Sequence, residues 1–165
     1  MKRVLLFMPF LLLIFSLGCV SQSSSEVVPD TIYIIYSPSC PHCHTLINYI
    51  DSLNLNIDVK KTTNGGDYVN FLKLHGINWD GGVPLTFSLL KNGTLITISG
   101  YPSSSQEKDG YFINMEYEKS MCERMGGSAV FINSTYKFCK LPNGMLLGNR
   151  YSIGYLINLI KRDLS

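Results

Sequence analysis

The stretch that decides the fold reads Thr31-Ile32-Tyr33-Ile34-Ile35-Tyr36-Ser37-Pro38-Ser39-Cys40-Pro41-His42-Cys43-His44-Thr45-Leu46-Ile47-Asn48-Tyr49-Ile50. Its first part, residues 31–36, is a run of β-branched and aromatic side chains, which predicts a buried strand. The part after the cysteines has apolar residues at the spacing of one helix face, namely Leu46, Ile47, Ile50 and, beyond the quoted stretch, Leu53. Both cysteines therefore lie on a predicted turn from a strand to a helix.

A cysteine at this position is favoured as a thiolate. A thiol at the start of a helix lies near unpaired backbone N–H groups and the positive end of the helix dipole, and both stabilise a negative charge. Pro41 suits the first helical turn because its missing N–H would have no partner there. A protonated His42 would add a positive charge beside the Cys40 sulfur. We therefore predict that Cys40 is the nucleophile and that Cys43 is the resolving thiol.

The chain begins with the features of an export signal. Met1-Lys2-Arg3 is basic, residues 4–17 are apolar, and the small residue Gly18 ends the apolar segment. A basic start, a short apolar core and a small residue at the cut are typical of a secretory signal. We therefore predict a signal peptide over residues 1–18 and leave this segment out of the fold.

Cys19 is a predicted lipid attachment site. Phe15-Ser16-Leu17-Gly18-Cys19 resembles a lipoprotein signal, which implies cleavage before Cys19 and attachment of lipid to that residue. Residues 19–30 are then expected to form a tether between the membrane and one domain over residues 31–165. The alternatives are an uncleaved N-terminal anchor, which is short for a membrane span, and ordinary secretion.

The charge of the mature chain gives no indication of a nucleic-acid partner. Loss of Lys2 and Arg3 with the signal lowers the number of basic residues from 14 to 12, which equals the number of acidic residues. Lipidation, an uncleaved anchor and secretion would each place the domain outside the cytoplasm, where disulfides form and persist. We therefore expect an extracytoplasmic, membrane-anchored protein in which cysteine pairs have structural or redox roles.

The remaining sequence alternates strand and helix patterns. Residues 55–60 alternate apolar and polar side chains, which predicts a strand at a sheet margin. Residues 68–74 predict a second helix, and Asn92-Gly93 between two apolar runs predicts a hairpin. Residues 151–162 predict a final helix with one apolar side. The expected order is strand, helix, strand, helix, hairpin and, at the end, helix.

These features together resemble the thioredoxin-like superfamily. The resemblance rests on Cys40-Pro41-His42-Cys43 after the first strand, on Val83-Pro84, and on the Asn92-Gly93 hairpin followed by Gly100. It implies an α/β fold in which helices flank a central mixed sheet and Pro84 is cis and faces the cysteines. It also implies that the catalytic residues are Cys40, Pro41, His42, Cys43 and Pro84 and that the backbone of Val83 pairs with a partner chain.

Within this superfamily, the dipeptide Pro41-His42 between the cysteines resembles that of DsbA-type oxidases. Ile34 stands where thioredoxins and DsbA proteins carry a buried carboxylate, so the proton acceptor of those proteins has no counterpart here. The resemblance implies a thiol–disulfide oxidoreductase, an oxidase or an isomerase, that acts on exported proteins bearing thiols or disulfides. It requires no cofactor and implies a redox partner in the membrane.

Residues 102–149 are an insertion before the last helix, relative to a minimal fold of this type. We expect a solvated loop over residues 103–110, a helix over residues 117–125, and a hairpin around Asn133-Ser134-Thr135. Cys122 and Cys139 lie on the two sides of this hairpin region. In an oxidising compartment they predict a structural disulfide that holds a loop-rich insertion together.

Other functions remain compatible with the same residues. Cys40-Pro41-His42-Cys43-His44 matches the attachment motif of c-type haem, with His44 as one axial ligand. The second ligand would come from Met115, Met121, Met125 or Met145. A copper or zinc carrier that uses the two thiolates, and a redox-inactive thioredoxin fold that serves as a binding module, are further alternatives.

Overall fold

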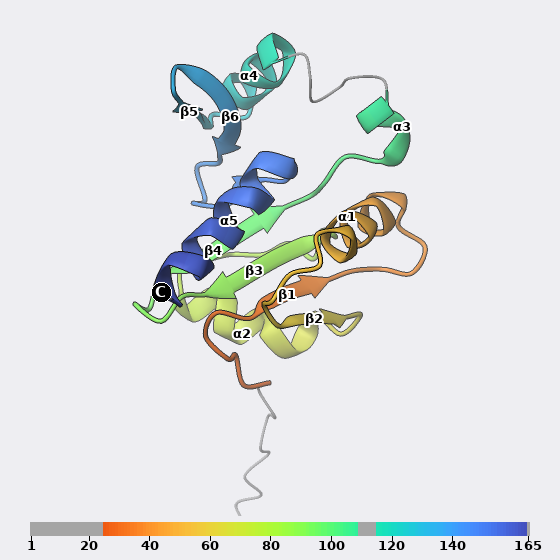
Figure 1. Ribbon diagram of the computed structural model, residues 1–165, viewed down its shortest axis with the longest axis vertical. Coiled ribbons are helices and arrows are strands. Elements are labelled where there is room, and N and C mark those ends of the chain that lie inside the picture. The colour runs from red at the N-terminus through yellow and green to blue at the C-terminus, as the bar shows by residue number, and fades with distance from the viewer. Residues whose placement is uncertain (1–24, 109–114, 165) are drawn as a thin grey trace, which may run out of the picture.

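The computed structural model of the protein describes residues 25–108 and 115–164. Over these residues it is an α/β structure with a seven-stranded mixed sheet in the order β2-β1-β3-β4-β7-β6-β5 and five helices, α1 to α5 (Figure 1). The predicted signal peptide and Cys19 lie outside the described residues. In the described part of the chain, no helix is both long and apolar enough to cross a membrane.

The predicted order of elements in the first half is confirmed. β1 (Ile32–Ile35) runs parallel to β2 (Val59–Thr62) and antiparallel to β3 (Leu85–Leu89), which forms a hairpin with β4 (Leu95–Ser99). Between them lie two helices, α1 (Pro41–Ser52) and α2 (Gly66–Leu74).

β2 begins later than the predicted strand over residues 55–60. Leu55 and Ile57 are partly buried and pack against the core from the loop before β2. The alternation of apolar and polar residues over 55–58 results from contact of Leu55 and Ile57 with the core, and these residues form no strand. β2 is nevertheless at one edge of the sheet, as predicted.

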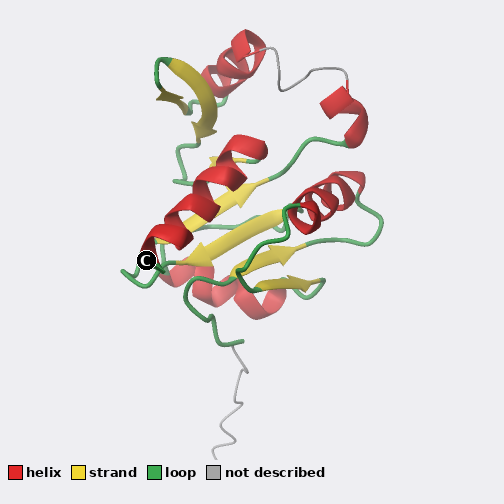
Figure 2. Cartoon of the chain, in the orientation of Figure 1, coloured by secondary structure: helices red, strands yellow, loops and turns green. Residues whose placement is uncertain are grey.

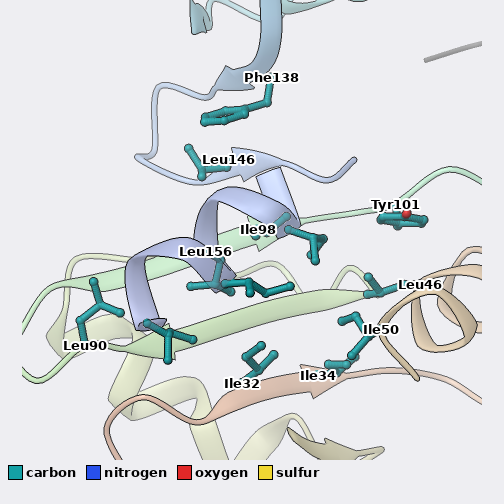
Figure 3. Packing of buried hydrophobic residues seen from close by; sticks show 13 residues of the cluster. Ile32, Ile34, Leu46, Ile50, Leu90, Ile98, Tyr101, Phe138, Leu146 and Leu156 are labelled. Atoms are coloured by element: carbon teal, nitrogen blue, oxygen red, sulfur yellow. The ribbon is translucent and has the colours of Figure 1, made fainter. Parts of the chain in front are cut away.

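The core has two layers because β1 is buried on both faces. Ile32 and Ile34 pack with α1 and α5 (Arg150–Asp163) on one face, and Figure 3 shows Leu46, Ile50 and Leu156 in this layer. Tyr33 and Ile35 belong to the layer that contains α2 on the opposite face. Figure 2 shows α1 and α5 in front of the sheet and α2 behind it. Successive strand residues point to opposite faces, so an unbroken apolar run suits this central strand.

The final helix forms as predicted, and its start is well defined. The Asn149 side chain accepts hydrogen bonds from the backbone N–H groups of Tyr151 and Ser152, at 2.9 Å each. The Ser152 hydroxyl in turn accepts from the Asn149 N–H at 2.9 Å, which completes a capping box. The face of α5 toward the core carries Ile153, Leu156, Ile157 and Ile160.

The segment predicted as an insertion contains α3 (Ser104–Lys108), α4 (Met115–Arg124), β5 (Ser128–Ile132), β6 (Thr135–Lys140) and β7 (Leu146–Leu147). The short helix α3 replaces most of the loop expected over residues 103–110, of which residues 109 and 110 lie outside the described residues. The expected helix and hairpin are present as α4 and β5–β6. Asn133 and Ser134 both have positive φ, at 51° and 61°, in the hairpin turn.

β7 has no counterpart in the sequence prediction. It pairs in parallel with β4 and in antiparallel fashion with β6, and so it joins the hairpin β5–β6 to the central sheet. The buried ring of Phe138 from β6 lies 5.3 Å from the ring of Tyr155 on α5. The Asn149 amide also donates to the Lys137 carbonyl at 2.9 Å. The insertion therefore extends the main sheet and core.

The described end of the predicted tether lies against the domain. Val27 packs at the edge of the second core layer, and the Val28 N–H donates to the Tyr33 hydroxyl at 2.8 Å. Asp30 is buried, its N–H donates to the Leu89 carbonyl at 2.8 Å, and its carboxylate lies 3.4 Å from the Lys91 ammonium. Contacts with the domain therefore extend into the predicted tether, through Val27 and Val28.

Candidate functional site

The two free cysteines are brought together at the start of α1. Cys40 is the N-cap of this helix, and its sulfur accepts a hydrogen bond from the Cys43 backbone N–H, with Sγ and N 3.2 Å apart. Pro41 occupies the first helical turn, as predicted. A sulfur in the N-cap position takes up one of the N–H groups that a helix start leaves without a partner.

Cys43 has a different environment. Its side chain is fully buried, whereas Cys40 is half-buried. Burial, together with the hydrogen bond between the two thiol side chains, raises the pKa of Cys43 from 9.0 to about 12. Below that pH Cys43 is a neutral thiol. The site thus contains one accessible sulfur and one protected sulfur.

The Val83-Pro84 bond lies opposite Cys40 and is cis, as the resemblance implied. The Cys40 thiol donates to the Val83 carbonyl, with Sγ and O 3.8 Å apart. The Pro84 carbonyl accepts from the Gly100 N–H at 2.9 Å, which ties this loop to the end of β4. The arrangement brings a main-chain segment 43 residues further along the sequence to the Cys40 sulfur.

His42 is fixed by the chain that follows β4. Its Nδ1 lies 2.7 Å from the Tyr101 carbonyl oxygen. A carbonyl can only accept, so Nδ1 carries the proton in this contact. The expected positive charge of His42 beside Cys40 stays a prediction, since the hydrogen bond is compatible with a neutral or a charged ring.

Together these contacts define a site with an accessible thiol, a buried thiol and a cis-proline loop. No protein-family model, curated protein or solved structure matches this chain. The chemistry of the site therefore follows from its own geometry.

A cleft of about 340 Å³ lies beside this site. It is lined by His42, Val83 and Pro84 from the predicted site and by Gly100, Tyr101, Pro102, Gln106, Met121, Leu147 and Gly148. Gln106, Met121 and Leu147 come from the insertion and are absent from the site that the sequence predicts. Met121 immediately precedes Cys122, but nothing in the sequence pattern indicates that this position lines a cleft with His42 and Pro84.

The second pair of cysteines forms the predicted disulfide. Cys122 on α4 is joined to Cys139 on β6, their Cα atoms are 5.6 Å apart, and both side chains are fully buried. Gly127 packs directly on this bond, because a Cβ atom there would lie 2.5 Å from the Cys139 sulfur. The disulfide therefore forms the centre of the small α4–β5–β6 unit.

The haem alternative invokes His44, in the first turn of α1, as an axial ligand. His44 is exposed, and its Nε2 lies 2.7 Å from the Pro38 carbonyl oxygen. Within residues 25–108 and 115–164, no group of three or more His, Cys, Asp or Glu residues is placed to hold a metal ion. The haem and metal-carrier functions thus stay hypotheses from the motif alone.

Proposed function

We propose that this protein has a thioredoxin-like fold and exchanges disulfides with other proteins through Cys40 and Cys43. The sheet β2-β1-β3-β4, with the two cysteines at the start of α1 and a cis proline before β3, supports this assignment. The observation that carries the proposal is the unequal pair of thiols. Cys40 is accessible and accepts a backbone N–H, while Cys43 is buried with its pKa raised to about 12.

The exchange proceeds in two balanced steps. The Cys40 thiolate attacks one sulfur of a partner disulfide, so that a Cys40–partner disulfide forms and the other partner sulfur leaves as a thiolate. Cys43 then loses its proton and attacks the Cys40 sulfur, which forms the Cys40–Cys43 disulfide and releases the second partner thiolate. Two electrons pass from this protein to the partner. The reverse sequence oxidises a partner dithiol.

The backbone at Val83 provides a means of holding the partner. Val83 is partly exposed, and its carbonyl faces Cys40. An extended partner segment that lies along this loop would form main-chain hydrogen bonds with Val83 while its own cysteine meets Cys40. Recognition by the main chain accepts many sequences, which suits a protein that acts on several partners.

The hydrogen bond from Cys43 N–H to Cys40 stabilises the reduced form, and this favours a role as an oxidant. Ile34 is fully buried in the apolar core, so the position of the carboxylate in thioredoxins offers no base for Cys43. We expect a reduction potential nearer to the value of about −120 mV for DsbA than to about −270 mV for thioredoxin.

Equilibration with glutathione buffers tests the proposed function. The fraction of the Cys40–Cys43 disulfide is measured by alkylation and mass spectrometry across ratios of reduced to oxidised glutathione. Cys40→Ala is the control, because it cannot form this disulfide. A potential near that of thioredoxin would assign the protein as a reductant or isomerase. Absence of the Cys40–Cys43 disulfide at every ratio would overturn the proposal.

The proposed site of action is outside the cytoplasm, at the membrane surface. The support comes from the export signal and Gly18-Cys19. A redox partner in the membrane would then restore the oxidised or reduced state. We expect the protein in the membrane fraction of its cell and its release by Cys19→Ser. An unmodified N-terminus downstream of Cys19 in the mature protein would contradict the lipid anchor.

A further inference from the structure

The insertion contributes several side chains to the cleft beside the site, and Met121 is one of them. Met121 lines this cleft together with His42, Val83 and Pro84, although it lies about 80 residues after Cys40 in the chain. It is partly exposed, whereas its neighbour Cys122 is fully buried. The α4 backbone thus directs Cys122 into the insertion and leaves Met121 on the cleft wall.

The disulfide fixes the position of Met121. Cys122 is bonded to Cys139 on β6, and the Cys122 carbonyl accepts from the Gly127 N–H at 2.9 Å. β6 is itself attached to the main core through the buried Phe138. The wall of the cleft is therefore tied to the same core that positions β1 and the cysteines. The disulfide near the site thus helps to hold the wall of the cleft in place.

The chemistry of the cleft favours an apolar occupant. Among the described residues that line it, none is Asp, Glu, Lys or Arg. A charged side chain entering such a cleft would lose hydration, and His42 is the one described lining residue that could offer a charge, to a carboxylate and only when protonated. The thioether of methionine is flexible and adapts to apolar groups of different shape. A volume of about 340 Å³ accommodates a side chain and adjacent backbone.

We propose that Met121 determines which partner segments react, by contacting an apolar side chain next to the partner's reacting cysteine. This inference rests on the proposed function of Cys40 and Cys43. The occupant of the cleft is an extended, locally apolar polypeptide segment. The main chain at Val83 holds the segment without regard to sequence, and Met121 adds a preference for apolar neighbours of its cysteine.

The test uses the full protein in its oxidised Cys40–Cys43 form and two short peptides. The peptides are identical except for a Leu or an Asp beside their cysteine, and the rate of peptide thiol oxidation is followed under excess peptide. We expect the wild-type protein to react about tenfold faster with the Leu peptide, a ratio within the range for apolar pockets. Met121→Ala is expected to reduce the ratio of the two rates severalfold, and Met121→Lys to favour the Asp peptide.

Two variants serve as controls for the ratio. Met121→Leu preserves an apolar side chain and is expected to retain the preference. Met125→Ala removes a methionine from the same unit, but Met125 is 41% exposed and does not line the cleft. Its ratio is expected to equal that of the wild-type protein. The intrinsic reactivities of the peptides cancel when variants are compared with the wild type.

The failures of the two proposals are distinguishable. If the oxidised wild-type protein reacts neither with the peptides nor with dithiothreitol, the proposed exchange function is wrong. If dithiothreitol and both peptides react but Met121→Ala retains the wild-type ratio, the role of Met121 is wrong and exchange stands. Equal slowing of both peptides by Met121→Ala would show a structural role only and would also overturn the inference.

Discussion

The two pairs of cysteines in this protein have opposite environments. Cys40 and Cys43 are free thiols at the start of α1, and one of them is accessible. Cys122 and Cys139 are 17 residues apart, joined, and fully buried. Access and local backbone, rather than the presence of cysteine, therefore determine which sulfurs can react. Under the proposed function, the first pair exchanges its bond and the second pair keeps it.

The largest expected effect separates the two members of the reactive pair. Cys43→Ala removes the resolving thiol, so we expect partner proteins to accumulate as mixed disulfides on Cys40. Cys40→Ala is expected to trap none, because the buried Cys43 with its raised pKa is a poor nucleophile. Non-reducing gels followed by mass spectrometry measure the adducts. Equal trapping by both variants would contradict the assigned roles.

The Cys122–Cys139 disulfide is expected to increase the free energy of unfolding. Replacement of both Cys122 and Cys139 by Ala removes a cross-link with a sequence separation of 17, which lowers the free energy of unfolding by about 3 kcal/mol in the chain-entropy model. Denaturant unfolding of the oxidised proteins measures this loss.

The two disulfides are expected to differ in their ease of reduction. Mild dithiol is expected to reduce a Cys40–Cys43 disulfide and to leave the buried Cys122–Cys139 bond intact. Peptide mapping without reduction identifies the bonds that survive. Recovery of Cys122 as a free thiol in the untreated protein, or joined to Cys40, would show that the two pairs are not separate.

The release of partners is expected to depend on pH through Cys43. Its pKa is raised to about 12, and the largest cause is burial of Cys43 itself rather than its contact with Cys40. The thiolate fraction below this pKa grows tenfold per pH unit, so the rate of resolution should rise about 100-fold from pH 6 to pH 8. Stopped-flow decay of a Cys40–peptide disulfide gives this rate. A flat profile would contradict the raised pKa.

A smaller effect is expected where the chain passes over the structural disulfide. Gly127→Ala places a Cβ atom 2.5 Å from the Cys139 sulfur and 3.0 Å from the Cys122 sulfur, so the free energy of unfolding should fall by about 1–3 kcal/mol. Gly154→Ala is the matched control, because no atom lies within 4 Å of its Cβ position on α5. It should stabilise the helix by up to about 1 kcal/mol. Thermal unfolding compares both variants with the wild type.

The sequence by itself determined the local features of the site. An apolar strand run followed by Cys40-Pro41-His42-Cys43 places both sulfurs on one turn, since residues three apart in a helix are neighbours. The pairing of Cys122 with Cys139 could also be predicted from the sequence, because the insertion contains no other cysteine. The cis form of Val83-Pro84 was expected from the family resemblance alone, because most bonds that precede a proline are trans.

The contacts between the insertion and the site could not be predicted from the sequence. β7 is two residues long, too short for a periodic pattern, and it forms a strand because β4 and β6 lie on its two sides. The contact of His42 with the Tyr101 carbonyl and the place of Met121 in the cleft likewise join positions far apart in the chain. Local propensity acts over a few residues, whereas such contacts follow from packing of the whole sheet and core.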